Sequence, residues 1–193
     1  SKNLGCQFIE TDVQVSSDGI PYIFHDDDLK RILNIDSRFD SISSSEIDKL
    51  RIFDHCKIPK LEDALNEFPD LSFQIDFKTN KVVSPALDVI NKTNTSNRVC
   101  VASFNSNRLQ KVRESYPDLC ISMGPNEVAK ILIASFGLFK GHIAGDCLQI
   151  PMKYYGIKVV TRKFVDYVKS RGLKIMVRTI NDVKTFEHLI DLK

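Results

Sequence analysis

Two apolar runs of the sequence carry charged residues at alternate positions. In "FIETDV", Glu10 and Asp12 are two residues apart, and in "FQIDFK" Asp76 and Lys78 repeat that spacing. Successive side chains of a β-strand point to opposite faces, so each pair would share one face. Neighbouring carboxylates repel one another unless a cation or a shared proton compensates. If the two strands are neighbours, Glu10, Asp12 and Asp76 are candidate ligands of a hard divalent cation, Mg²⁺ or Ca²⁺.

Two further residues could act on an anionic substrate beside such a cation. Lys78 would place a positive charge there, for which a phosphate is the natural partner, or it could simply form an ion pair with Asp76. His25 stands in "YIFHDDDLKR", thirteen residues after Asp12 and beyond a turn. A histidine that titrates near neutrality can donate or accept a proton, so His25 is the candidate catalytic acid or base. We expect Asp26 to orient it and Asp27 and Asp28 to be solvated.

These residues lie in a regular alternation of strand-like and helix-like segments. Strands are predicted at 7–15, 71–77, 98–104, 119–124, 146–151 and 173–180, and helices at 60–68, 81–92, 105–115, 126–136, 161–171 and 182–191. Asn105, Thr161 and Asn181 are candidate N-caps, and Gly172 is a candidate helix terminator. The alternation predicts an α/β fold with a parallel sheet, either open and doubly wound or most of a (β/α)8 barrel. No glycine-rich phosphate loop is present.

Residues 16–70 interrupt the alternation. A turn at Asp18-Gly19 is predicted to lead into a short strand, followed by a polar, serine-rich segment. We interpret this region as an elaborated βα-loop, the place where barrel enzymes carry their chemistry, within a single domain that spans 1–193.

The composition narrows the classes of function. A net charge of +2 in 193 residues does not argue for a nucleic-acid partner. No apolar segment is long enough to cross a membrane. The five cysteines are widely spaced and show no zinc-binding pattern, so Cys100 and Cys120 are interpreted as small buried thiols. Reduced thiols favour a cytoplasmic location, a periplasmic or secreted location stays open, and so does the oligomeric state.

Several motifs, in order, resemble the glycerophosphodiester phosphodiesterase family. Glu10-x-Asp12 followed by His25-Asp26-x-x-Leu29-x-Arg31 is similar to the core signature of that family. Further similar segments are "IPKLEDAL" (58–65), "QIDFK" (74–78), "ASFN" (102–105), "LQIP" (148–151) and "VRTIND" (177–182). Together they extend over nearly the whole chain.

The resemblance implies a (β/α)8 TIM barrel of the phospholipase-C-like type. It implies divalent-cation-dependent hydrolysis of glycerophosphodiesters to glycerol 3-phosphate and an alcohol. Glu10, Asp12 and Asp76 would be the metal ligands, His25 the catalytic acid or base, and Lys78 a phosphate contact. Arg178 stands where the family typically has tryptophan, so it could contact the substrate phosphate instead or point away from it.

The sequence also departs from the family pattern. The His-Arg-Gly motif of the first family strand does not occur, and neither does the closing strand. We therefore expect a barrel that lacks its first and last strands, with weak cation binding and little activity. Two alternatives stay open: a lysophospholipase-D- or sphingomyelinase-D-like enzyme that cuts lipids, and a non-catalytic barrel that binds phosphodiesters. A lipid enzyme would need an exposed apolar rim, for which "ILIASFGLF" (131–139) is the candidate segment, although a buried helix is the simpler interpretation of it.

Overall fold

The computed structural model describes residues 5–53, 55–154 and 156–192 as a succession of strands and helices. The strands are β1 (Phe8–Val15), β2 (Pro21–Ile23), β3 (Ser72–Phe77), β4 (Val99–Ala102), β5 (Cys120–Ile121), β6 (Cys147–Ile150), β7 (Lys153–Tyr154), β8 (Ile157–Lys158) and β9 (Lys174–Val177). The helices are α1 (Lys30–Leu33), α2 (Ser44–Ile47), α3 (Leu61–Glu67), α4 (Val83–Lys92), α5 (Ser106–Ser115), α6 (Pro125–Ser135), α7 (Arg162–Ser170) and α8 (Val183–Asp191).

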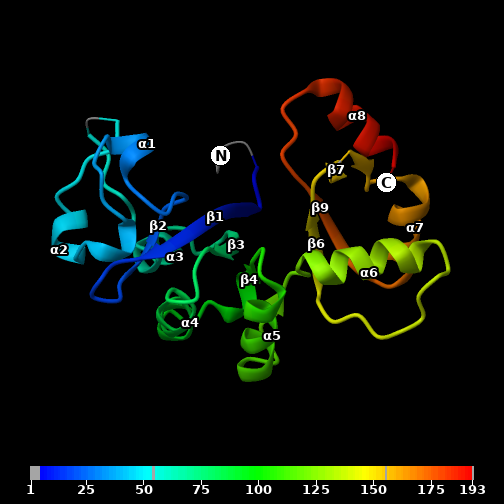
Figure 1. The fold of residues 1–193 in the computed structure, drawn as a ribbon, viewed down its shortest axis with the longest axis horizontal. Coiled ribbons are helices and arrows are strands. Elements are labelled where there is room, and N and C mark those ends of the chain that lie inside the picture. The colour runs from blue at the N-terminus through cyan, green and yellow to red at the C-terminus, as the bar shows by residue number, and fades with distance from the viewer. Residues whose placement is uncertain (1–4, 54, 155, 193) are drawn as a thin grey trace.

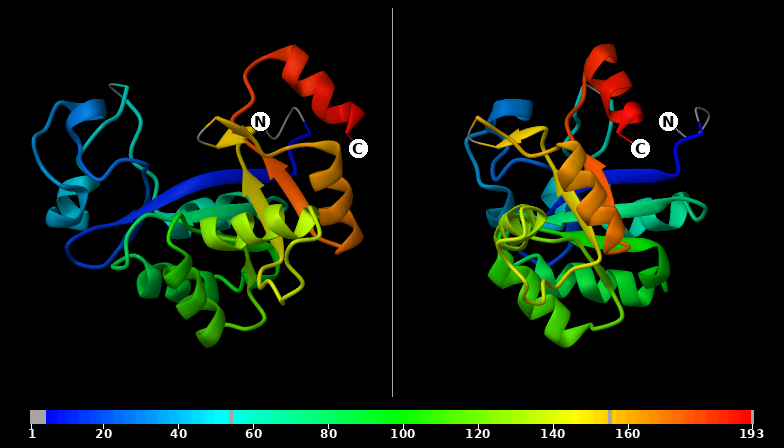
Figure 2. Two further views of the ribbon diagram at one scale, coloured as in Figure 1. Left: turned by 45° about the vertical axis from the view of Figure 1, so that its right-hand side comes forward. Right: turned by 90° about the vertical axis from the view of Figure 1, so that its right-hand side faces the viewer.

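The longer strands form a curved parallel sheet. β1, β3, β4 and β5 are parallel neighbours in that order. A parallel bridge between Ser122 and Cys147 continues the sheet to β6, which pairs with β9. Helices α4, α5, α6 and α7 follow the outer side of this curve (Figures 1 and 2). Strands joined through outer helices are the arrangement of a (β/α) barrel, which confirms the predicted fold class.

The alternation of side chains along β3 agrees with the prediction. Phe73, Ile75 and Phe77 are at most 1% exposed and pack into one apolar cluster with α3, α4 and α5. The residues between them, Gln74 and Asp76, therefore face the concave side. The helices bury the apolar face of the sheet and leave the polar face toward the inside of the curve.

Residues 16–60 form a lobe beside the sheet, seen in blue and cyan in Figure 1. Gly19, with a φ of 86°, makes the turn from β1 into the antiparallel β2. A separate apolar cluster fills the lobe, built around Tyr22, Phe39 and Ile47, each 0% exposed. The serine-rich segment thus has a core of its own beside the strands that it interrupts.

Details at the ends of the elements differ from the predictions. Asn105 and Thr161 accept backbone hydrogen bonds as N-caps, but α8 is capped by Asp182 instead of Asn181. Gly172, with a φ of 71°, follows α7 as predicted. The strands after β3 are shorter than predicted, and the β7–β8 hairpin was not predicted. None of the helices in the described ranges is long and apolar enough to cross a membrane.

Candidate active site

Asp12 and Asp76 lie side by side on the concave face. They are register partners on the adjacent parallel strands β1 and β3. The ammonium group of Lys78 reaches both carboxylates, 2.6 Å from Asp12 Oδ1 and 3.4 Å from Asp76 Oδ2. Burial alone would lower the pKa of Lys78, but the two carboxylates outweigh it and the pKa lies above its usual value. The strand-end pair of Asp76 and Lys78 is therefore part of a three-residue charged cluster.

The Asp76 carboxylate fits a cation. Its side chain is 2% exposed, and Oδ1 has no hydrogen-bond partner among the described residues. A buried carboxylate oxygen without a partner is costly, and a divalent cation would compensate it. The donors here are carboxylate oxygens, which suit a hard ion such as Mg²⁺ or Ca²⁺.

Glu10 does not join the other two carboxylates in this structure. Its Oε1 lies 2.8 Å from Nη1 of Arg178 and 3.4 Å from Nε2 of Gln149. Within the described ranges, Glu10, Asp12 and Asp76 are not among the groups whose ligand atoms approach within 4.8 Å of one another. The predicted ligand set is thus brought together in part, with Asp12 and Asp76 adjacent and Glu10 bound by Arg178.

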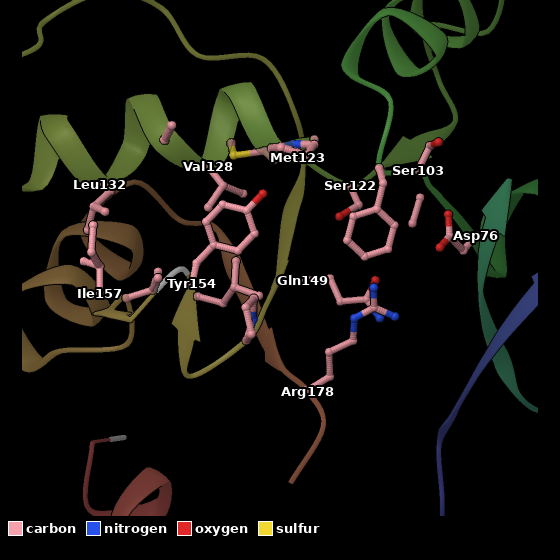
Figure 3. Close-up of a pocket in the computed structure, with 18 residues that line it drawn as sticks. Asp76, Ser103, Ser122, Met123, Val128, Leu132, Gln149, Tyr154, Ile157 and Arg178 are labelled. Atoms are coloured by element: carbon pink, nitrogen blue, oxygen red, sulfur yellow. The ribbon is translucent and has the colours of Figure 1, made fainter. Parts of the chain in front are cut away.

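Arg178 connects distant parts of the barrel. It follows β9, pairs with Glu10 on β1, and lies over the ring of Phe104 at 5.0 Å, beyond the end of β4. Figure 3 shows Arg178 beside Gln149, with Asp76 across from them on β3. Phe104 and Gln149 were not predicted as site residues. They belong to the "ASFN" and "LQIP" segments. The resemblance of these segments to family motifs was the one feature of the sequence that pointed to Phe104 and Gln149 as site residues.

His25 follows β2, and its side chain is 64% exposed. Its Nδ1 is 2.6 Å from Asp26 Oδ1, and Asp26 also accepts two hydrogen bonds from Arg31, at 2.6 and 2.9 Å. Hydrogen bonds from Arg31 and then His25 lower the pKa of Asp26 to about 2. Nε2 of His25 has no hydrogen-bond partner among the described residues. The backbone N–H of Phe24 donates to Asp12 O at 3.0 Å, which ties the histidine loop to the acidic strand.

The neighbouring polar residues have structural contacts. Asp27 and Asp28 are exposed, as expected, and they also accept hydrogen bonds from Gln14 Nε2 and from the Lys30 N–H, each at 2.9 Å. Both aspartates therefore hold the loop that carries His25. The remaining histidines, His55, His142 and His188, are exposed.

A cavity of about 280 Å³ opens beside the charged cluster. Asp76 and Arg178 lie at one end of it, and apolar side chains cover the other, from α6 and the β7–β8 region (Figure 3). The apolar part includes Val128, Leu132, Ile157 and Val159. The cavity thus combines a charged end with an apolar wall.

A barrel of parallel strands with charged side chains gathered toward the carboxyl ends of those strands defines a TIM-barrel enzyme. Solved structures share this fold. One is a phosphodiesterase from Oleispira antarctica in complex with the product sn-glycerol-3-phosphate, with a TM-score of 0.79 and 21% identity, covering 98% of this chain and 79% of that one. Another is a glycerophosphoryl diester phosphodiesterase domain from Mycobacterium tuberculosis, with a TM-score of 0.82 and 17% identity, covering 99% and 84%.

The sequence comparisons give the family. Residues 1–193 match the "Glycerophosphoryl diester phosphodiesterase family". The protein of Mycobacterium tuberculosis named "Probable glycerophosphodiester phosphodiesterase 2" is 26% identical, over 98% of this chain and 74% of its own length. The glycerophosphodiester phosphodiesterase of Caldanaerobacter subterraneus is also 26% identical, over 97% and 79%. The chain belongs to the glycerophosphoryl diester phosphodiesterase family, a family of hydrolases.

Proposed function

We propose that this protein hydrolyses glycerophosphodiesters to glycerol 3-phosphate and an alcohol. The observation that carries the proposal is the pair of register partners Asp12 and Asp76, with Lys78 between their carboxylates. The family match and the product bound to the relative from Oleispira antarctica support the same reaction.

Asp12 and Asp76, joined by Glu10, would hold a divalent cation, Mg²⁺ or Ca²⁺. When bound, such a cation polarises a phosphoryl oxygen and orients the phosphodiester. Lys78 contributes a positive charge to the phosphate from its position between the two aspartates. Arg178 offers a planar guanidinium group from the opposite side of the opening, and its contact with Glu10 sets its direction.

His25 transfers the proton. Asp26 holds its Nδ1, and Arg31 holds Asp26, so the ring is oriented through two successive contacts. The other ring nitrogen, Nε2, is then free to donate a proton to the leaving alcohol or to accept one from the nucleophile. A positioned acid or base of this kind contributes roughly 10²- to 10⁴-fold to the rate.

The 193 residues contain no His-Arg-Gly motif, so cation binding and turnover are measured separately. Calorimetric titration with Ca²⁺ measures cation binding, and glycerol 3-phosphate released from glycerophosphocholine measures activity. Asp76→Asn should abolish both, whereas Asp166→Asn, which alters an exposed residue of α7, should change neither. His25→Ala should lower turnover at least about 100-fold and leave Ca²⁺ binding intact. Unchanged Ca²⁺ affinity in Asp76→Asn would overturn the proposed metal site, and Ca²⁺ binding without turnover would favour a non-catalytic barrel.

A second candidate function is the cleavage of lysophospholipids. The apolar wall of the cavity favours it, because glycerol and choline offer little apolar surface for Val128, Leu132 and Ile157 to cover. The segment 131–139, which we interpreted as a buried helix, is helical only as far as Ser135, and beyond it Phe136 and Leu138 are 55% and 80% exposed. Comparing turnover of lysophosphatidylcholine with that of glycerophosphocholine decides between the two substrates.

A further inference from the structure

Three cysteines that are distant in the sequence meet inside the barrel. Cys100 on β4 and Cys120 on β5 are register partners. Cys147 on β6 forms a parallel bridge with Ser122, which lies two residues after Cys120. The three sulfur atoms all lie within 4.8 Å of one another, and those of Cys100 and Cys147 are 3.4 Å apart. All three are free thiols. Neither the proposed hydrolysis nor its residues make use of them.

The separations suit a single metal ion. Zinc–thiolate bonds of about 2.3 Å in a tetrahedral centre place the sulfurs about 3.8 Å apart. The Cys100–Cys147 separation of 3.4 Å is close to this value and the other two separations are no more than 4.8 Å, so small side-chain rotations would bring the three sulfurs onto one ion. Because the cysteines lie on neighbouring strands of a packed sheet, the backbone already supplies the arrangement.

The surroundings favour a bound ion. Gln74 is the register partner of Cys100 and is 1% exposed, yet neither its Oε1 nor its Nε2 has a partner among the described residues. Lys174 is the register partner of Cys147. A thiolate is the form of cysteine that binds metals.

We propose that Cys100, Cys120 and Cys147 bind one thiophilic divalent ion of the Zn²⁺ type inside the barrel. Three thiolates, one divalent ion and the Lys174 ammonium group sum to zero charge. A tetrahedral ion on three sulfurs keeps a fourth position, and a water molecule there would give the Gln74 amide a hydrogen-bond partner. The ion would tie β4, β5 and β6 together where β5 is only two residues long.

This site differs in chemistry from the carboxylate site. Thiolates select soft or borderline ions, whereas carboxylates suit Mg²⁺ and Ca²⁺. Cys100 lies two residues before Ala102, the register partner of Asp76, so Cys100 is closer to the start of its strand than the acidic pair is. The protein would therefore hold two metal ions of different kinds.

The experiment uses Co²⁺ as a spectroscopic substitute for Zn²⁺. The full chain, reduced and freed of metal with a chelator, is titrated with Co²⁺, and the near-ultraviolet thiolate-to-cobalt band reports how many thiolates bind. We expect one Co²⁺ per chain with three thiolates, displaced by Zn²⁺. Cys120→Ser should weaken binding at least about 100-fold, since losing an outer-shell partner alone costs roughly 10- to 100-fold. Cys56→Ser, which alters an exposed thiol, is the matched control and should bind Co²⁺ normally.

Two measurements keep the test decisive. Circular dichroism checks that the Cys120→Ser chain folds. If that variant does not fold, the parent chain is treated with a thiol reagent instead, and Zn²⁺ should protect three of its five thiols. Asp76→Asn should keep the Co²⁺ band, which separates this proposal from the proposed hydrolysis. Absence of the band, a band from fewer than three thiolates, or equal affinity in the folded Cys120→Ser chain would overturn the site.

Discussion

Nη1 of Arg178 lies 2.8 Å from Oε1 of Glu10, although β9 and β1 are not neighbours in the sheet. The contact joins side chains that are 168 positions apart in the sequence. Glu10, one of the three predicted metal ligands, is therefore paired with the guanidinium group of Arg178. Arg178 and a divalent ion therefore compete for Glu10, and the phosphate competes with Glu10 for Arg178.

Replacing Arg178 tests this competition. In Arg178→Ala, Glu10 is free to join Asp12 and Asp76, so Ca²⁺ affinity should rise about two- to fivefold, the range expected for losing a partly exposed ion pair. Glycerol 3-phosphate should bind more weakly, because a phosphate contact is lost. Calorimetry measures both affinities, with Arg171→Ala at the exposed end of α7 as the control of equal charge. A fall in Ca²⁺ affinity would show instead that Arg178 positions Glu10 for the ion.

Lys78 should matter for stability as well as for the phosphate. Lys78→Met leaves the carboxylates of Asp12 and Asp76 without their shared cation, and the unfolding free energy at pH 7 should fall by about 3 kcal/mol. Ca²⁺ should restore part of that loss by binding the folded chain. Urea unfolding with and without Ca²⁺ measures this. Lys81→Met breaks a pair with Asp40 in which Lys81 is 69% exposed, and it should cost less than about 1 kcal/mol.

The sign of the pH dependence follows from the pKa of Lys78. Because the folded-state pKa is raised, the contribution of Lys78 is fully present below its unfolded value of about 10.4. It is lost as the pH rises through the folded-state pKa. If Lys78→Met lowers the unfolding free energy equally at pH 7 and at a pH above the folded-state pKa of Lys78, the ion-pair explanation is contradicted.

The support of His25 can be tested through Asp26. NMR titration of the Asp26 carboxyl carbon should give a midpoint of about 2. Since this folded-state pKa is lowered, the stability that Asp26 contributes is present above its unfolded pKa of about 3.9 and is lost as the pH falls toward 2. Arg31→Gln removes the strongest contact and should move the midpoint upward. A midpoint that stays in place would mean that Arg31 does not hold Asp26 in solution.

The apolar cavity can be tested by changing the polarity of its wall. Leu132→Asn alters the part of α6 that lines the cavity, away from Asp76 and Arg178. If the cavity holds an acyl chain, turnover of lysophosphatidylcholine should fall roughly tenfold or more, because lost apolar contacts cost about 1–3 kcal/mol. Turnover of glycerophosphocholine should stay within about twofold of the parent. Ile133→Asn, at a 47% exposed position of the same helix, is the matched control, and equal losses on both substrates would argue against a lipid subsite.

Local chemistry made much of the fold and part of the site predictable. The alternation of strands and helices gave the parallel α/β arrangement, and the period of two along each strand put Asp12 and Asp76 on the polar face. The caps at Asn105 and Thr161 followed from side-chain chemistry within one helical turn. The short strands were less predictable in extent, because β5 depends on its neighbours for its hydrogen bonds and not on its own sequence.

The sequence by itself determined the family signature, the fold class and the acidic pair, because each depends on spacing within short segments. Only the tertiary structure decided which distant side chains meet. The curvature of the sheet brings Arg178 to Glu10, and the register of three strands gathers Cys100, Cys120 and Cys147, whose linear spacing gave no sign of a cluster. Register and curvature are collective properties of all the strands, so no single segment could reveal these contacts.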